Sequence, residues 1–213
     1  MKRLDRSTAA APPCLTRYRH GRDEWSALAT TRADYDEVVN RLEALQGKRC
    51  AYCESDLSRE SGRPHVEHFR QRARAPELTF VWGNLFRSCT HAGHCGKHKD
   101  AVASSYLPGD LIKPDEDEPR RFLKFLSDGS VEPRVELPPL EGQRASETIR
   151  VFALDCARLR GARRAHLAGP WTVIQQAMAA GFSDGDFEAF LRSEATSWSG
   201  SPFSSAILDV FGL

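Results

Sequence analysis

Long apolar runs are missing from this sequence of 213 residues. A membrane-spanning helix needs about 20 consecutive, predominantly apolar residues, and no segment approaches that length. The first residues, MKRLDRSTAAAPPC, also lack the apolar stretch of a secretory signal. We therefore expect a cytoplasmic protein that makes no contact with a membrane.

An excess of charge of either sign is missing as well, since 30 lysines and arginines stand against 29 aspartates and glutamates. The distribution of charge is more informative. Residues 68–100 contain six basic and two acidic residues, whereas residues 110–147 contain ten acidic and six basic residues. A basic centre beside an acidic flank favours a polyanionic substrate at the centre, although a solvated charged face has the same composition.

Cysteine is scarce, with six residues, but four of them lie between positions 50 and 95. Cys50 and Cys53 form a CxxC pair, and Cys89 and Cys95 have five residues between them. Two thiolate pairs joined by a connector are typical of structural zinc, which takes four tetrahedral ligands. The alternative is four ordinary buried thiols, but polar residues surround them, and a reducing cytosol favours metal over disulfides. We therefore predict one zinc ion bound by all four.

The N-terminal half contains several predicted elements. Residues 1–23 mix basic residues with alanine and proline, which predicts a poorly ordered arm with some turn structure. A helix is expected from about residue 31 to Gly47, because apolar residues recur at steps of three and four. Further elements are expected as a loop at 54–64, a short strand at 64–69, a short strand or turn at 79–82, and a helix from Cys95 toward Tyr106.

The C-terminal half is predicted to be mainly helical. The sequence FLKFLSDGSVE at 122–132 favours two strands around a turn. Helices are expected at 141–166, 171–180 and 187–196, and the tail at 202–208 is expected to pack on the core. The arginines of the first helix, including Arg163, are interpreted as a solvated face or, alternatively, as nucleic-acid contacts. The predicted segments are 1–46, 47–108 and 109–213.

The motif HVEHF at 65–69 carries residues suited to phosphodiester hydrolysis, which requires a base, a cation and a scaffold for one phosphate. His68 is the natural base, because imidazole titrates near neutral pH. Glu67 offers a hard oxygen ligand for Mg²⁺. Adjacent strand residues point to opposite faces, so their joint use would require a bend or ligation at the strand edge.

The order of motifs, with CAYC, EH, NL and a second cysteine pair before a short helix, resembles the HNH nucleases. With KPDEDEP, FLSDGS and ETIRVF, the segment from Cys50 to Arg164 resembles more closely the PtuB family, HNH effectors that work with the ATPase PtuA in Septu-type and retron-linked anti-phage systems. The resemblance implies an α+β protein: a ββα-metal core braced by a four-cysteine zinc site, with mainly helical N- and C-terminal flanks.

The same resemblance implies roles for four residues. His68 corresponds to the general base and Glu67 to a ligand of a catalytic Mg²⁺ or another divalent metal. Asn84 corresponds to the residue that braces the base-bearing loop, although it could also be a turn-forming asparagine. His98 corresponds to the second metal-binding position, on the helix. The candidate nucleic-acid contacts are Arg70, Arg72, Arg74, Lys97 and Lys99.

Two features depart from many HNH proteins. Gly96 follows the fourth cysteine, where asparagine or histidine is common, and the second cysteine pair is spaced by five residues rather than two. Other candidates for the helix ligand are His94, His91 and Asp100. His65 is either a third catalytic histidine or a supporting surface residue.

Two functions from different classes fit this sequence. One is a metal-dependent endonuclease, acting on DNA or on structured RNA such as tRNA, in a defence complex with a PtuA-like ATPase. The other is a zinc-braced module that binds nucleic acid or protein without cleavage. The adjacent carboxylate and imidazole favour the nuclease, because a binding module does not need them. The acidic segment and the helices after Asp110 are predicted to dock the partner.

Overall fold

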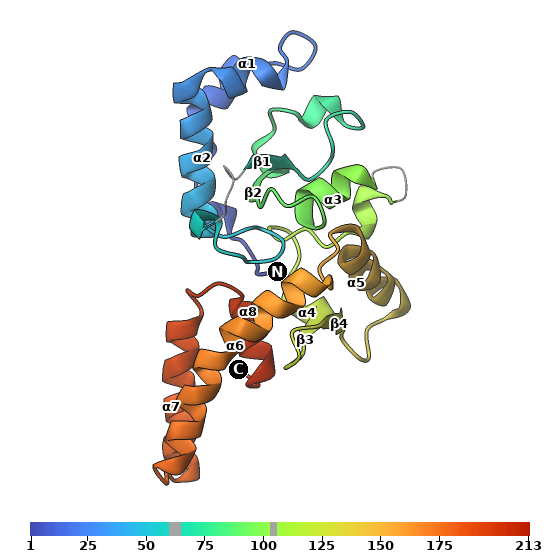
Figure 1. Cartoon of the computed structure of the whole chain (residues 1–213). Coiled ribbons are helices and arrows are strands. Elements are labelled where there is room, and N and C mark those ends of the chain that lie inside the picture. The colour runs from blue at the N-terminus through green and yellow to red at the C-terminus, as the bar shows by residue number, and fades with distance from the viewer. Residues whose placement is uncertain (60–64, 103–105) are drawn as a thin grey trace.

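The computed structural model describes residues 1–59, 65–102 and 106–213. The α-helices there are α1 (Trp25–Thr30), α2 (Arg32–Gln46), α3 (Cys95–Ala101), α4 (Pro119–Phe122), α5 (Pro139–Val151), α6 (Ala157–Ala179), α7 (Asp184–Trp198) and α8 (Ser204–Val210). The strands are β1 (His65–His68), β2 (Leu85–Ser88), β3 (Leu123–Phe125) and β4 (Val131–Pro133) (Figure 1). This mixture of helices and strands confirms the coarse fold prediction. The expected loop at 54–64 and helix toward Tyr106 lie partly outside the described residues.

Helix α2 forms where its apolar spacing predicts it. Val38, Leu42 and Leu45 fall on one face and are buried, as steps of four and three residues require. Gly47 ends the helix in the left-handed conformation, with φ of 64°, and its N–H donates to the carbonyl of Glu43, which is a common helix ending because glycine has no Cβ to clash.

The N-terminal arm is ordered, so the prediction of a poorly ordered segment at 1–23 is wrong. Leu4 and Leu15 are buried, and the Leu4 N–H donates to the Pro114 carbonyl over 2.8 Å. Arg6 forms an ion pair with Asp115, and its guanidinium lies over the ring of Phe86 at 4.7 Å. Composition alone suggested disorder, but Leu4 and Arg6 find partners on distant parts of the chain.

Strands β1 and β2 form an antiparallel pair in which His65 lies opposite Ser88 and His68 opposite Leu85. The strand expected at 64–69 is thus present, whereas residues 79–82 form turns. The partner strand, β2, begins at Leu85, and the Gln46 side chain binds its backbone at Arg87. The Gln46 side chain accepts from the Arg87 N–H at 2.8 Å and donates to the Arg87 carbonyl at 3.0 Å.

The second sheet confirms the predicted hairpin, since β3 and β4 pair with Phe125 opposite Val131. The C-terminal helices differ from the prediction in two places. The pattern at 141–166 is divided between α5 and α6, and α6 continues through Pro170 without a new helix at Trp171. The division falls at Phe152, which is buried against Tyr52 with ring centroids 4.1 Å apart. The helix ends where Phe152 packs against Tyr52, and α6 begins five residues later at Ala157.

Arg163 is not on a solvated or nucleic-acid-facing surface, so that interpretation is wrong for this arginine. Its side chain is 1% exposed and donates to the carbonyls of Gly129 and Leu154 at 2.9 and 2.7 Å. Burial lowers the pKa of the guanidinium, against the opposing charges of Cys53 and Glu54. Arg163 therefore joins α6 to the β3–β4 turn.

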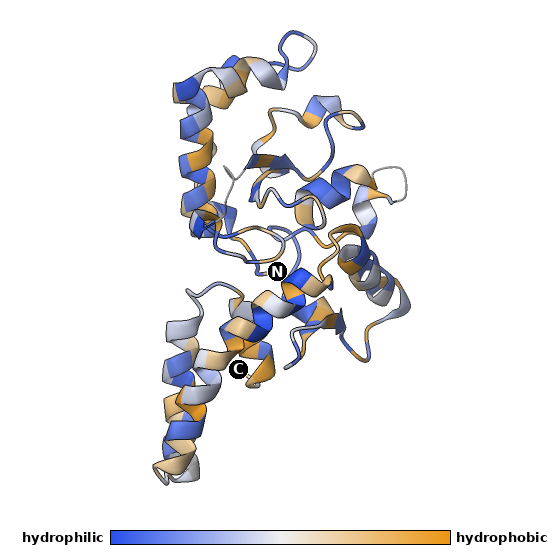
Figure 2. Ribbon diagram, in the orientation of Figure 1, coloured by the Kyte–Doolittle hydropathy of each residue, from blue (hydrophilic) through white to orange (hydrophobic). Residues whose placement is uncertain are grey.

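One hydrophobic cluster extends from Met1 to Ala206 and includes residues of all three predicted segments. A second, smaller cluster is formed by Leu167, Ile174, Trp198 and Ile207. It holds together α6, α7 and α8, and the distal parts of α6 and α7 project from the body (Figure 1). Apolar residues, coloured orange, recur along both of these helices (Figure 2). No helix within the described ranges is long and apolar enough to cross a membrane.

Candidate active site and zinc centre

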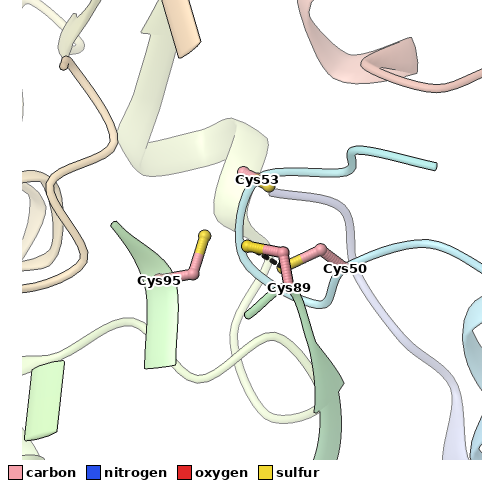
Figure 3. A group of neighbouring side chains, drawn as sticks. All are labelled: Cys50, Cys53, Cys89 and Cys95. Carbon is pink, nitrogen blue, oxygen red and sulfur yellow. Dashed lines mark hydrogen bonds between the residues drawn. The ribbon is translucent and has the colours of Figure 1, made fainter. Parts of the chain in front are cut away.

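The four predicted zinc ligands converge from three parts of the chain. Cys50 and Cys53 lie in the turn after α2, Cys89 follows β2, and Cys95 begins α3. All four are buried, and their sulfur atoms lie within 4.8 Å of one another (Figure 3). The sulfurs of Cys50 and Cys89 are 3.9 Å apart. Tetrahedral zinc with Zn–S bonds of about 2.3 Å places sulfurs about 3.8 Å apart, so the cluster fits a zinc ion.

Polar groups around the cluster are placed to hydrogen-bond to sulfur. His94 Nδ1 lies 3.3 Å from the sulfurs of both Cys89 and Cys95. The Ser55 hydroxyl lies 3.2 Å from the sulfur of Cys53. These contacts are those that stabilise thiolate ligands. His94, an alternative for the helix metal ligand, therefore belongs to the surroundings of the cysteines.

The pKa values of the four thiols indicate that a bound cation is needed for all of them to ionise. Although burial disfavours the thiolate, hydrogen bonds from the other cysteines hold the pKa of Cys50 well below its usual range. Burial and the neighbouring Cys50 raise the pKa of Cys95 far above its usual range. Four sulfurs this close cannot all ionise unless a metal ion compensates their charge.

Glu67 and His68 leave β1 in opposite directions, as strand geometry requires. Glu67 is 1% exposed and points toward α3, where the Lys99 ammonium lies 2.8 Å from its Oε1. Its other oxygen, Oε2, lies 3.3 Å from His65 Nε2. The carboxylate of Glu67 is thus held by an ion pair at Oε1, which accepts no hydrogen bond, and by His65 at Oε2.

His68 points toward α1 instead. Its Nε2 lies 3.0 Å from the Thr79 carbonyl oxygen, and its ring meets the Trp25 ring edge-on with centroids 4.6 Å apart. Burial lowers the pKa of His68 to about 4, against the raising effect of its hydrogen bond to Thr79. The imidazole is therefore neutral at neutral pH, and because Nε2 donates to the carbonyl, Nδ1 keeps the lone pair.

Asn84 connects the two ends of the loop that follows His68. Its side-chain oxygen accepts from the Arg70 N–H at 2.7 Å, and its amide nitrogen donates to the carbonyls of Arg70 and Leu78 at 3.0 and 3.2 Å. Asn84 is 4% exposed. Its hydrogen bonds set the shape of the loop that carries the Thr79 contact of His68.

Glu67 and His98, the predicted metal pair, meet different neighbours through the atoms that make contacts. His98 Nδ1 lies 2.9 Å from the carbonyl oxygen of Val151, at the end of α5. The α3 residues on the side of Glu67 are Gly96 and Lys99. Within the described parts of the chain, the four cysteines are the group of three or more His, Cys, Asp or Glu side chains placed to hold a metal.

The candidate nucleic-acid contacts divide into two sets. Arg70, Arg72, Arg74 and Lys97 are exposed, and Arg74 also donates to the Tyr106 carbonyl at 3.0 Å. Lys99, in contrast, is 0% exposed, so the prediction that it contacts nucleic acid is wrong. Lys97 and Lys99 look alike in sequence, but residues two apart on a helix lie on opposite sides.

A cavity of about 540 Å³ lies next to Trp25 and Thr79, the two residues that contact His68. Trp25 and Thr79 line it together with His20, Arg22 and Arg72. Sequence reasoning did not single out Trp25 or Thr79, and no local signal marks them, because both reach His68 only through the folded chain. Asp23 and Glu24 line the cavity as well, so side chains of both signs lie close to the two residues that contact the candidate base.

Comparisons with known proteins add one relationship. No family model matches this chain. Over 83 residues it is 32% identical to the Septu protein PtuB of Bacillus thuringiensis. The match covers 39% of this chain and 30% of that protein. It supports a Septu-related chain, in agreement with the resemblance seen in the motifs, and it leaves the activity and partners of the whole protein as proposals.

Gly96, a departure from many HNH proteins, has a structural cause. A Cβ added at this position would lie 2.6 Å from the carboxyl carbon of Glu67. We expect Gly96→Ala to lower the free energy of unfolding by about 1–3 kcal/mol, because overpacking displaces the buried carboxylate. Urea unfolding measures this. Gly142→Ala in α5 is the control, since nothing lies within 4 Å of its added Cβ. Equal stability of Gly96→Ala and the parent protein would contradict the prediction.

Proposed function

We propose that this chain is a metal-dependent HNH endonuclease that hydrolyses phosphodiester bonds of nucleic acid, as the effector of an anti-phage defence complex. The observation that carries the proposal is His68: a neutral imidazole, oriented on both sides, beside a loop of exposed arginines. The motif resemblance and the match to a Septu protein support it.

In this proposal His68 Nδ1 accepts the proton of the attacking water. Its Nε2–H is held by the Thr79 carbonyl, and the Trp25 edge fixes the plane of the ring. Such positioning contributes to general-base catalysis because the proton acceptor needs no reorientation. Arg70, Arg72 and Lys97 would hold the phosphates on either side of the scissile bond.

The catalytic metal fits less well than the zinc. A divalent ion would supply charge stabilisation at the leaving oxygen, but His98 Nδ1 lies at the Val151 carbonyl and Glu67 is paired with Lys99. We therefore assign no step of the reaction to that ion. Asp100, another candidate of the sequence analysis, lies nearer, since its Oδ1 shares the Lys99 ammonium with Glu67.

The burial of Glu67 against Lys99 favours the second candidate function. A zinc-braced module that binds nucleic acid without cleavage needs no free carboxylate. One assay distinguishes the two: the purified protein, with and without a PtuA-like ATPase, is incubated with duplex DNA and with tRNA, in the presence and absence of Mg²⁺. We expect Mg²⁺-dependent cleavage of one substrate. Binding without cleavage under every condition would favour the module.

Partner docking is proposed for the α6–α7 projection rather than for the acidic segment. Asp115 pairs with Arg6 and Asp117 with Arg144, so these carboxylates serve the fold. Large apolar side chains are exposed on and beyond α6, with Met178 at 66% and Phe182 at 44%. Phe182 also packs edge-on against Phe190 of α7 with ring centroids 5.6 Å apart, and apolar side chains that gather in this way on a surface mark protein contacts.

We expect the double substitution Met178→Glu and Phe182→Glu to weaken co-purification with a PtuA-like ATPase by about tenfold or more, because charges would replace the apolar anchors. Zinc content should not change. The control is Glu116→Lys, at an exposed acidic residue. If Glu116→Lys abolished the complex and the double variant did not, the interface would lie on the acidic segment.

A further inference from the structure

Lys99 holds a buried ammonium group in the middle of the candidate site. The side chain is 0% exposed, and its Nζ lies 2.8 Å from Glu67 Oε1, 2.7 Å from Asp100 Oδ1 and 3.0 Å from the His68 carbonyl oxygen. The contacts to Asp100 and to the His68 carbonyl are hydrogen bonds, whereas the contact to Glu67 is an ion pair, and Glu67 Oε1 accepts no hydrogen bond. These two carboxylates raise the pKa of Lys99 against the lowering effect of its burial, and it stays charged.

The surroundings of this ammonium are those of a hard cation. Two carboxylate oxygens and one carbonyl oxygen are ligands that Mg²⁺ and Ca²⁺ take, at about 2.1 Å and 2.4 Å. The distances from Lys99 Nζ to the three oxygens are 2.7–3.0 Å, which is longer than a metal–oxygen bond. Small movements would therefore let the same oxygens bind a metal ion.

Glu67 cannot turn elsewhere to meet a metal. The carboxyl group of Glu67 fills the space that a Cβ on Gly96 would take. Its Oε2 faces His65. Asp100 lies on the solvent side of the site, with 48% of its side chain exposed. A cation that binds Glu67 Oε1 from the side of Asp100 would therefore take the place of the ammonium.

We propose that Glu67, Asp100 and the His68 carbonyl oxygen form a single cation site, which Lys99 occupies, and that a divalent ion binds Glu67 only in exchange for the Lys99 ammonium. This inference rests on the geometry around Lys99 and not on cleavage activity. If the chain is a nuclease, the exchange keeps its metal site closed until Lys99 moves.

The test measures Mn²⁺ binding by electron paramagnetic resonance in zinc-loaded protein. Lys99→Met removes the resident cation and leaves two carboxylates without it. We expect this variant to bind Mn²⁺ roughly tenfold or more tightly than the parent, since no cation has to leave first. We also expect its melting temperature to rise on adding Mg²⁺, relative to NaCl of equal ionic strength. The control, Lys97→Met on the exposed side of α3, should match the parent in both measurements.

Two further measurements guard against a misfolded variant. In the double variant Glu67→Gln and Lys99→Met, which removes both charges, the added Mn²⁺ binding should disappear. In the parent protein, Lys99 should resist an amine-acylating reagent until Mn²⁺ binds, with Lys97 as the reactive internal standard in mass spectrometry. Mn²⁺ binding that leaves Lys99 protected would overturn the exchange. So would the lack of any Glu67-dependent binding in all variants. Neither readout involves cleavage, so failure here is distinct from failure of the nuclease proposal.

Discussion

Replacing Cys50 with serine is expected to unfold the centre of the protein and to release about one zinc ion per chain. The sulfur of Cys50 lies 3.9 Å from that of Cys89, and all four sulfurs are within 4.8 Å of one another. Structural zinc contributes roughly 10–16 kcal/mol of apparent binding free energy in small zinc-binding units. The free energy of unfolding of a domain is only about 5–15 kcal/mol. If the loss of one ligand releases the zinc ion, the lost binding free energy can therefore exceed the whole free energy of unfolding.

Elemental analysis and thermal unfolding monitored by circular dichroism check this prediction. Cys156→Ser is the matched control, because Cys156 lies outside the group of four sulfurs. This control should keep its zinc and its melting temperature. Well-folded parent protein that contains no zinc would contradict the prediction directly.

Replacing His68 with alanine is expected to lower the cleavage rate by about 10² to 10⁴, which is the usual effect of removing a positioned general base. The zinc centre should survive, because His68 is not among its four ligands. Loss of the ring leaves a gap against Trp25, so a modest decrease in stability is expected as well. Cleavage kinetics and nucleic-acid affinity are measured on the same preparations.

The controls separate chemistry from folding. His166→Ala changes an exposed histidine of α6, outside the candidate site, and should leave the rate unchanged. His68→Gln keeps much of the side-chain volume but supplies no titrating base, so it should be as slow as His68→Ala. Full activity in either His68 variant would remove the hydrolytic interpretation, whereas lost activity with unchanged binding would support it.

The elements that local sequence could predict are those that depend on local contacts. Helix α2 follows from the spacing of Val38, Leu42 and Leu45 and from the glycine that ends it. The β3–β4 hairpin follows from its turn residues. Strand β2 was not predicted, because Gln46, distant in sequence, holds Arg87 in the ladder. The order of the N-terminal arm likewise depends on Pro114 and Asp115.

The sequence by itself determined that Cys50, Cys53, Cys89 and Cys95 would form one group able to hold a metal, since their paired spacing is that of metal ligands. It also determined that Glu67 and His68 would point apart, since strand residues alternate. Only the tertiary structure decided what each of them meets. It placed Trp25 and Thr79 on His68 and the Lys99 ammonium on Glu67. It also turned His98 toward α5. The physical reason is that a buried charge must find its partner in three dimensions, and neither residue type nor local spacing specifies which distant group that will be.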